Sequence, residues 1–235
     1  MIPIVLGVYE SQKTDTVGTG TTRQTTDLRI LWFAAQMPGG DIACQPLTDQ
    51  HLPSGFVQPV ERDVFLSGYH PVPQVYDESL RGVVNALRDR MNGMDSVLAV
   101  KTLPREEAML FRGLMAFLHA KPDIPPSDAD MLSVRTMLDA MRQTKNLVFE
   151  YQRVITDAAI ELRKKRNFEA AVTYYQKALV LDSGNDHIMF NLARAYFEMG
   201  KFNEARGMLY QALEVNPELE VARRFLRYLD ASSAG

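Results

Sequence analysis

The sequence has almost no cysteine, and its apolar residues never form a long run. Cys44 is the one cysteine in 235 residues, which excludes a disulfide within the chain and leaves a thiolate metal site dependent on other ligands. No run approaches the roughly 18 apolar residues of a membrane-spanning helix. The apolar start, Met1 to Tyr9, lacks a basic leader and is followed at once by Glu10, so we expect no signal peptide. We therefore expect a cytoplasmic protein that is not inserted in a membrane.

An excess of charge of either sign is also missing. The chain has 26 basic and 29 acidic residues and a net charge of −3, so no overall basic field argues for a nucleic-acid partner. The densest charge run, Arg163 to Arg166, falls where a helix is expected to end, and cations there offset the helix dipole. A contact with a phosphate or an acidic partner is the alternative interpretation of this run.

Residues with catalytic or metal-binding chemistry are few and scattered. His70, His119 and His187 show no metal-ligand spacing. Cys44 and His51 are a conceivable nucleophile and base, but no third group is placed to orient them. The glycine- and threonine-rich residues 17–22 are only superficially similar to a phosphate-binding loop, because no lysine follows the glycines. We therefore predict no catalytic, metal or cofactor site, and do not expect an enzyme.

The part of the chain up to Pro73 has the pattern of strands and irregular structure. Residues 2–9 predict a short strand, and the polar residues 11–26 predict an exposed loop. Residues 27–46 predict a hairpin around a turn of proline and glycine. The proline-punctuated residues 46–73 are interpreted as an extended strap or a loose linker, with one short helix at about 60–67.

Helical periodicity begins just after Pro73. Apolar residues at helical spacing predict one helix that ends at Asn92 and a second that begins at Pro104. A third is expected over 128–150, with a bend or break near Asn146. The first half of the chain therefore combines a hairpin, a strap and several helices.

The C-terminal third contains two near-copies of one pattern. The sequence numbers of Phe168 and Phe202 differ by 34, and so do those of Ala171 and Ala205. A period of about 34 residues is typical of a helix-turn-helix unit that stacks into a solenoid. The second copy carries Leu192, Ala193, Tyr196, Gly200, Phe202, Ala205, Leu209, Ala212 and Pro217, and the first carries Ala158, Ala159, Leu162, Phe168, Ala171, Tyr175 and Ala178.

On these residues, the stretch from 152 to about 219 resembles the tetratricopeptide repeat. It departs from the family pattern at Arg166, where glycine is usual, and at Ser183, where proline is usual. Ala171 and Ala205 are small where two helices should cross closely, and Gly200 suits a left-handed helix end. The resemblance covers under a third of the chain and is silent on everything that precedes Tyr151.

We therefore predict a mainly helical α+β protein in two parts. Residues 1–126 form a region of no recognised family, and residues 127–235 form the repeat domain, with repeats at about 152–185 and 186–219 and a capping helix at 219–230. Two repeats are too few to cover their own apolar faces. We accordingly expect the helix of 128–150 to pack on the repeats from the other end.

The resemblance also implies a binding groove, because the first helix of each repeat lines the concave face in this family. The positions that it implies for partner binding are Arg153, Thr156, Ile160, Arg163, Lys164, His187, Phe190, Asn191, Arg194, Phe197, Arg224 and Tyr228. Their mixture of cations and aromatic rings suits a protein or peptide with acidic groups and an apolar anchor. Alternatively, the N-terminal segment of the same chain covers Phe190 and Phe197.

Some family members clamp a carboxyl terminus with lysine, asparagine and arginine at set positions. Asn191 matches one of them, but Thr156 and Ile160 stand where the first lysine and asparagine would be. Val221 and Phe225 replace the last basic pair. The resemblance therefore does not support this clamp.

Three functions remain open at this point. The first is a non-catalytic adaptor, scaffold or assembly factor that binds a partner in the groove. The second is an enzyme or ligand-binding N-terminal domain that carries the repeats as a docking arm. The third is a self-assembling protein, a homo-oligomer whose hairpin donates a strand to a neighbour.

Overall fold

The computed structural model describes residues 2–17, 24–92, 97–119 and 125–232. The chain forms two compact units, Met1–Glu150 and Tyr151–Gly235, called here the N-terminal and C-terminal units. The N-terminal unit holds an antiparallel sheet and helices, and the C-terminal unit is helical.

A five-stranded antiparallel sheet organises the N-terminal unit. Its strands are β1 (Ile4–Val17), β2 (Gln24–Gln36), β3 (Ile42–Pro46), β4 (Gln58–Val60) and β5 (His70–Pro71). They lie side by side in the order β4-β3-β2-β1-β5. The predicted strand at 2–9 and hairpin at 27–46 both belong to this sheet, as β1 and the β2–β3 pair.

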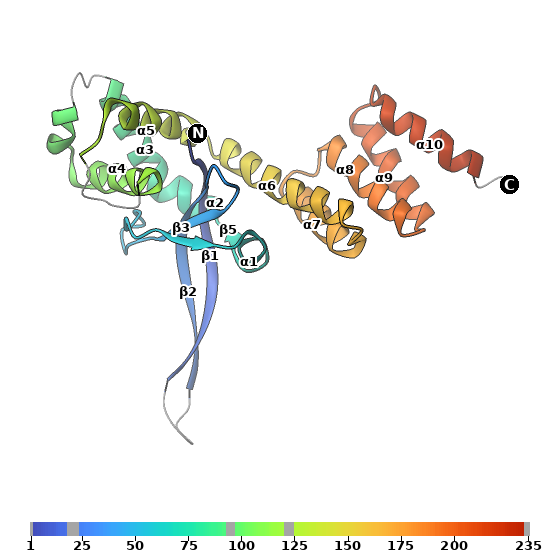
Figure 1. Cartoon of the computed structure of the whole chain (residues 1–235), viewed down its shortest axis with the longest axis horizontal. Coiled ribbons are helices and arrows are strands. Elements are labelled where there is room, and N and C mark those ends of the chain that lie inside the picture. The colour runs from blue at the N-terminus through green and yellow to red at the C-terminus, as the bar shows by residue number, and fades with distance from the viewer. Residues whose placement is uncertain (1, 18–23, 93–96, 120–124, 233–235) are drawn as a thin grey trace. The chain divides into compact units, whose positions relative to one another are not determined.

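The prediction of an exposed loop at residues 11–26 is wrong for residues 11–17 and 24–26, while residues 18–23 lie outside the described residues. β1 runs on to Val17, β2 resumes at Gln24, and the two strands pair along their whole length. β3 pairs only with Trp32 to Gln36, and β5 only with Tyr9 and Glu10. Beyond those residues β1 and β2 continue as a two-stranded ribbon (Figure 1). The polar sequence of residues 11–26 was interpreted as a loop, because polarity alone does not show that two segments pair as strands.

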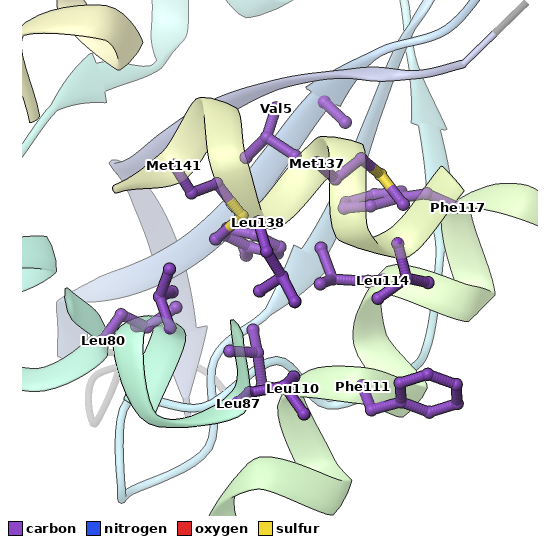
Figure 2. Close-up of a cluster of buried hydrophobic side chains, with 14 of the residues drawn as sticks. Val5, Leu80, Leu87, Leu110, Phe111, Leu114, Phe117, Met137, Leu138 and Met141 are labelled. Carbon is purple, nitrogen blue, oxygen red and sulfur yellow. The ribbon is translucent and has the colours of Figure 1, made fainter. Parts of the chain in front are cut away.

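One face of the sheet carries the main core of this unit. Val5, Val8, Phe33, Ala35 and Ala43 of the strands are buried there with the apolar sides of three helices. The helices are α3 (Arg81–Asn92), α4 (Arg105–Leu118) and α5 (Asp128–Met141). Figure 2 shows the side chains of these helices converging in one cluster with the strand residue Val5.

The opposite face of the sheet is covered by α1 (Arg62–Gly68), which confirms the short helix predicted near 60–67. The rings of Tyr9 and Phe65 lie 4.8 Å apart, and those of Trp32 and Tyr69 lie 5.9 Å apart. Cys44 of β3 has no exposed surface. The aromatic contacts attach the proline-rich segment to the sheet.

A buried glutamine fastens the start of that segment to α4. The Gln45 side chain donates from Nε2 to the carbonyl of Gly113 at 2.7 Å, and its Oε1 accepts from the amide of Gly55 at 3.1 Å. A Cβ placed on Gly113 would lie 2.5 Å from the Cβ of Pro53, so only glycine permits this approach. The segment is thus a packed strap.

The helical part of this unit begins with α2 (Pro73–Val75) and a π-helical turn (Tyr76–Leu80) that lead into α3. A 3-10 helix at Val97–Thr102 precedes α4. The buried hydroxyl of Tyr76 donates to the carbonyl of Met141 and so ties this turn to the end of α5. The helices predicted to end at Asn92 and to begin near Pro104 are both present.

The N-terminus of α5 has a capping box. Asp130 accepts hydrogen bonds from Ser127 and interacts with His119 across 2.7 Å. Partial burial acts to raise the pKa of Asp130, but these hydrogen bonds and the charge of His119 outweigh it and lower the pKa. The charged carboxylate therefore stabilises this corner.

The helix predicted over 128–150 is two helices. α5 ends at Met141 and α6 (Thr144–Lys164) begins just before the predicted break at Asn146. The buried side of α5, including Val134 and Leu138, belongs to the core of the N-terminal unit. The expectation that this helix packs on the repeats is therefore wrong. The boundary predicted at 126/127 likewise differs from the division at 150/151.

The C-terminal unit consists of the second part of α6 followed by α7 (Phe168–Leu181), α8 (Asp186–Glu198), α9 (Phe202–Val215) and α10 (Glu220–Ser232). Ala171, Ala178, Ala205 and Ala212 have no exposed surface. Small side chains at these positions let α7 and α9 approach neighbouring helices closely, as the repeat pattern predicts. Ala222 and Leu229 of α10 are buried too, which confirms its role as a cap.

Two turns end the first helices of the repeats in the same way. The amides of Arg166 and Gly200 donate to the carbonyls of Arg163 and Phe197, and the next amides donate to the carbonyls of Leu162 and Tyr196. This pair of hydrogen bonds is the Schellman motif. Arg166 has φ 63° and Gly200 has φ 72°, so both lie in the left-handed region.

Candidate functional site

The first helix of each repeat and the capping helix supply the candidate site. The central one of these, α8, begins after Asn185, whose side chain accepts a hydrogen bond from the amide of Ile188. Leu192 and Ala193 of α8 are buried, which leaves Phe190, Arg194 and Phe197 only partly covered. These three residues lie at helical spacing on one side of α8.

A small aromatic cavity opens between α8 and α10. It has a volume of about 210 Å³ and is lined by Phe190, Arg194, Phe197, Glu198 and Phe225. The ring of Phe225 lies 6.2 Å from that of Phe190 and 5.3 Å from that of Phe197, with edge-to-face geometry in both pairs. The guanidinium carbon of Arg194 lies 5.9 Å from the centre of the Phe190 ring, within cation–π range. The cavity has room for one apolar side chain beside a cation.

A second, larger cavity lies at the far end of α8. It measures about 630 Å³, and its walls include Phe197, Phe202 and Tyr228 together with polar residues of the α8–α9 turn. Phe197 is 5.6 Å from Phe202 and 5.9 Å from Tyr228. Phe197 therefore contributes to both cavities, and Tyr228 is brought to the second one.

The arginines of the C-terminal unit fall into two groups. Several are occupied in ion pairs: Arg153 with Asp157 at 3.3 Å, Arg206 with Asp230 at 3.1 Å, and Arg223, Arg224 and Arg227 with Glu220 at 3.8, 3.1 and 3.4 Å. Arg163 and Arg194 form no ion pair with a carboxylate in the described part of the chain. Of these two residues, Arg194 also lines the aromatic cavity.

Arg163 and Arg194 both act on one buried hydroxyl, that of Tyr175 on α7. Burial raises the pKa of Tyr175, and a hydrogen-bond interaction with Arg163 together with the positive charges of Arg163 and Arg194 partly offsets the rise. Tyr175 has no exposed surface, and no hydrogen bond of acceptable geometry satisfies its hydroxyl. The hydroxyl oxygen of Thr156 and Nε of Arg163 on α6 are also buried without a partner.

The twelve positions implied by the family resemblance are distributed unevenly. Phe190, Arg194 and Phe197 meet at the aromatic cavity, and Tyr228 joins Phe197 at the second. Arg153 and Arg224 are held in ion pairs. The remaining positions line neither cavity: Thr156, Ile160, Arg163 and Asn191 are half-buried, and Lys164 and His187 are exposed.

Three residues described above were not among the predicted site residues: Phe225 and Phe202, which line the two cavities, and Tyr175, whose buried hydroxyl interacts with Arg163 and Arg194. Phe225 was assigned to the inner side of the cap, and Phe202 and Tyr175 occupy repeat positions that explain them as packing residues. The aromatic excess of α10 could have revealed Phe225. No sequence signal distinguishes a satisfied tyrosine hydroxyl from one that lacks a partner.

The N-terminal unit holds the pair that was considered for catalysis. Cys44 is fully buried, and burial raises the pKa of its thiol to about 12, so it stays protonated and unreactive at neutral pH. His51 hydrogen-bonds Ser79 through Nδ1 at 2.9 Å. The strap is thereby attached to the π-helical turn, and Cys44 and His51 do not act as nucleophile and base.

The N-terminal unit also has an open cavity of about 760 Å³ between the first turns of α3 and α4, and half of its lining residues are charged, among them Arg81, Arg105 and Glu107. Among the described residues, no three His, Cys, Asp or Glu side chains are grouped to hold a metal ion. The phosphate-loop-like residues 18–22 lie outside the described residues. Within the described chain, no helix is both long and apolar enough to cross a membrane.

Comparison with known proteins gives a family match in the C-terminal part of the chain and a similar relative. A family model described as tetratricopeptide repeat matches residues 162–225. A 56-residue segment is 41% identical to Hsp70-Hsp90 organizing protein 1 of Glycine max; it spans 24% of this chain and 10% of the soybean protein. Both matches agree with the paired helices, the small residues at their crossings and the repeated helix ends. The C-terminal part of the chain is a tetratricopeptide-repeat region.

Proposed function

We propose that this chain is a non-catalytic adaptor that binds a peptide segment of a protein partner along α8 and α10. The aromatic cavity takes an apolar side chain of that segment, and Arg194 beside it takes an acidic group. The observation that supports this is the three phenylalanine rings, gathered around a cavity of about 210 Å³ with an unpaired arginine at its edge. Aromatic residues and arginine are the residue types that dominate binding energy at protein interfaces.

The size of the aromatic cavity favours a side chain over a free small molecule. Pockets for drug-sized ligands have volumes of about 300–1,000 Å³ and bury most of the ligand. The aromatic cavity is smaller than this range. A peptide that inserts one residue and continues along the helices fits better, and tetratricopeptide repeats are interaction modules.

The soybean relative is named as an organizer of Hsp70 and Hsp90, which supports an adaptor role here. Its partners do not follow from that name. The carboxyl-terminal clamp needs lysine and asparagine where this chain has Thr156 and Ile160. We therefore propose an internal acidic and apolar segment as the bound peptide.

Photo-cross-linking in the source organism tests the proposal. A photoreactive amino acid at His187 or Tyr228, both exposed, should capture a partner that can be identified by mass spectrometry. The double change Arg194→Glu with Phe197→Ala should abolish capture. Tyr210→Ala removes a similarly exposed ring from α9 and should leave capture unchanged. Capture that survives the double change would refute the proposed site.

A second candidate function is self-association through the β1–β2 ribbon. Ser11 to Val17 and Gln24 to Ile30 pair with each other but with no third strand among the described residues. Unpaired strand edges are sites for strand addition by another chain. Sedimentation at high concentration should then show a dimer that is lost when the ribbon is shortened; a monomer throughout would reject this function.

A further inference from the structure

The two cavities of the C-terminal unit share a wall. Phe197 lines the aromatic cavity on one side and the larger cavity of about 630 Å³ on the other. Its ring lies 5.3 Å from that of Phe225 in the first cavity and 5.9 Å from that of Tyr228 in the second. The rings of Phe225 and Tyr228 on α10 are 6.4 Å apart. The two cavities are therefore neighbours, separated by a single aromatic side chain.

The larger cavity suits a second large apolar side chain. Its aromatic walls are Phe197, Phe202 and Tyr228, and about half of the surface of Phe202 and of Tyr228 is exposed. The charges around it balance: they are Lys201, Glu204 and the ion pair of Arg206 with Asp230 at 3.1 Å. The cavity thus offers accessible aromatic rings without an excess of either charge, and aromatic residues are common binding hot spots.

Beside the cavities, α10 carries more positive charge than it neutralises. Arg224 and Arg227 both pair with one oxygen of Glu220, at 3.1 and 3.4 Å, and Arg223 reaches the other oxygen at 3.8 Å. One carboxylate cannot neutralise three guanidinium groups. The side chains of Arg224 and Arg227 are 72% and 73% exposed, and such exposed ion pairs are weak enough to exchange partners. Arg224 lies one helical turn from Tyr228, so the excess charge is next to the second cavity.

We propose that the partner segment is extended and carries two large apolar residues separated by one residue, with an acidic residue beside them. This rests on the proposed function and adds a second apolar anchor and a second contact for acidic groups. One anchor enters the aromatic cavity and the other enters the larger cavity. The acidic residue binds Arg224 and Arg227. In an extended peptide, side chains two positions apart point the same way and lie about 7 Å apart, which suits two cavities on either side of one ring.

The space between α8 and α10 favours an extended segment over a helix. The ring of Phe225 on α10 lies 6.2 Å from Phe190 and 5.3 Å from Phe197, so side chains bridge the two helices. A helix with its side chains is about 10–12 Å wide and has no room between them. An extended segment needs to insert only its alternate side chains.

Selection from a phage-displayed library of random dodecapeptides on the full-length chain tests the spacing. Enriched peptides should contain two large apolar residues separated by one residue, with an aspartate or glutamate beside them. Apolar residues four positions apart, as on a helix, would overturn the proposal, and so would a single apolar residue. Enriched sequences that match a segment of this same chain would assign the site to a second copy instead.

Tyr228→Ala tests the second anchor. Binding of an enriched peptide should fall about tenfold, whereas the melting temperature should change little because the ring is more than half exposed. The loss should disappear for a peptide in which the anchor of the larger cavity is already alanine, and it should persist when only the other anchor is alanine. Tyr210→Ala, a similarly exposed ring on α9, should bind as wild type does.

The charge is tested by Arg224→Gln combined with Arg227→Gln. Binding of the acidic peptide should fall about three- to tenfold, and the loss should vanish when the acidic residue of the peptide is replaced by its amide. Arg223→Gln is the control on the same helix, because Arg223 also pairs with Glu218 at 3.2 Å, and it should change binding less than about twofold. An equal loss for the amide peptide would refute the acidic contact.

The outcomes separate this proposal from the proposed function. Of the two cavities, Phe190 lines only the aromatic one. If Tyr228→Ala binds the enriched peptide as wild type does while Phe190→Ala does not, the second anchor is refuted and the aromatic cavity stands. If Phe190→Ala binds as wild type does, or if no peptide is enriched, both proposals fail.

Discussion

Replacing Arg166 with glycine should stabilise the C-terminal unit. Arg166 and Gly200 occupy equivalent helix ends with the same hydrogen bonds, and both have positive φ, 63° and 72°. A non-glycine residue in the left-handed region costs roughly 1–2 kcal/mol. Glycine loses more backbone entropy on folding than other residues, which offsets about 0.5–1 kcal/mol of the stabilisation gained by relieving the strain. The net stabilisation expected for Arg166→Gly is therefore about 0.5–1 kcal/mol.

The reverse change at the other turn should have the opposite sign. A Cβ placed on Gly200 meets nothing within 4 Å, so Gly200→Ala tests the backbone conformation without a steric clash. We expect it to cost about 0.5–1 kcal/mol, by the same balance of strain and entropy. Arg166→Ala is the matched control: it removes the charge but keeps a side chain at positive φ, and should give little or none of the gain.

Hydrogen exchange of the full-length chain, followed by mass spectrometry, measures these effects within one unit. Amides of α7 to α9 should exchange about two- to fivefold more slowly in Arg166→Gly, which corresponds to about 0.5–1 kcal/mol. Equal exchange in Arg166→Gly and Arg166→Ala would show that charge, not backbone strain, sets the effect. Faster exchange in Arg166→Gly would refute the reasoning.

Four further predictions concern stability and reactivity. Gly113→Ala should lower the free energy of unfolding by roughly 1–3 kcal/mol, because a Cβ there would clash with the strap. Gly82→Ala on α3, where a Cβ meets no atom within 4 Å, is the control and should leave the free energy of unfolding unchanged or raise it; calorimetry measures both variants. Cys44 should react with iodoacetamide at pH 8 only after unfolding, and rapid labelling of the native protein would contradict its burial and its pKa of about 12. The pKa of Asp130 is lower in the folded protein than the unfolded value of about 4, so the charged carboxylate stabilises the fold above pH 4 and this stabilisation is lost as pH falls through the folded pKa. Asp130→Asn should therefore lower the free energy of unfolding at pH 7, and acid denaturation curves should show a progressively smaller difference from wild type. Ala205→Leu should overpack a helix crossing and cost about 1–3 kcal/mol, and an unchanged melting temperature would contradict that packing.

The repeat region could be predicted from the sequence because its contacts are local. Each helix from α7 to α10 packs mainly on its neighbours in the chain. One repeated sequence pattern therefore predicts both the helix and its packing surface. The buried alanines and the turn at Gly200 followed from that pattern. The resemblance to the family also implied that Phe190 and Phe197 of α8 line a groove, because helical spacing separates them from the buried Leu192 and Ala193.

The sheet was less predictable because strand pairing is not local. Residues 11–17 and 24–30 form a paired ribbon although their sequence is rich in polar residues, and such a composition is also typical of a loop. A run of polar residues can be recognised as a strand only when the strand that pairs with it is known. Sequence alone therefore found the two hairpin segments near the core but not the length of β1 and β2.

The sequence by itself determined that the C-terminal third is a pair of tetratricopeptide-type helix hairpins with a cap, because periodic spacing fixes which side of a helix is apolar. It did not determine what that side meets: the apolar side of α5 suits any apolar surface, and only the tertiary structure assigned it to the sheet. The same holds for Tyr175, whose ring follows from the repeat. That the positive charges of Arg163 and Arg194 both act on its buried hydroxyl depends on three helices at once, and no local sequence pattern predicts such an arrangement.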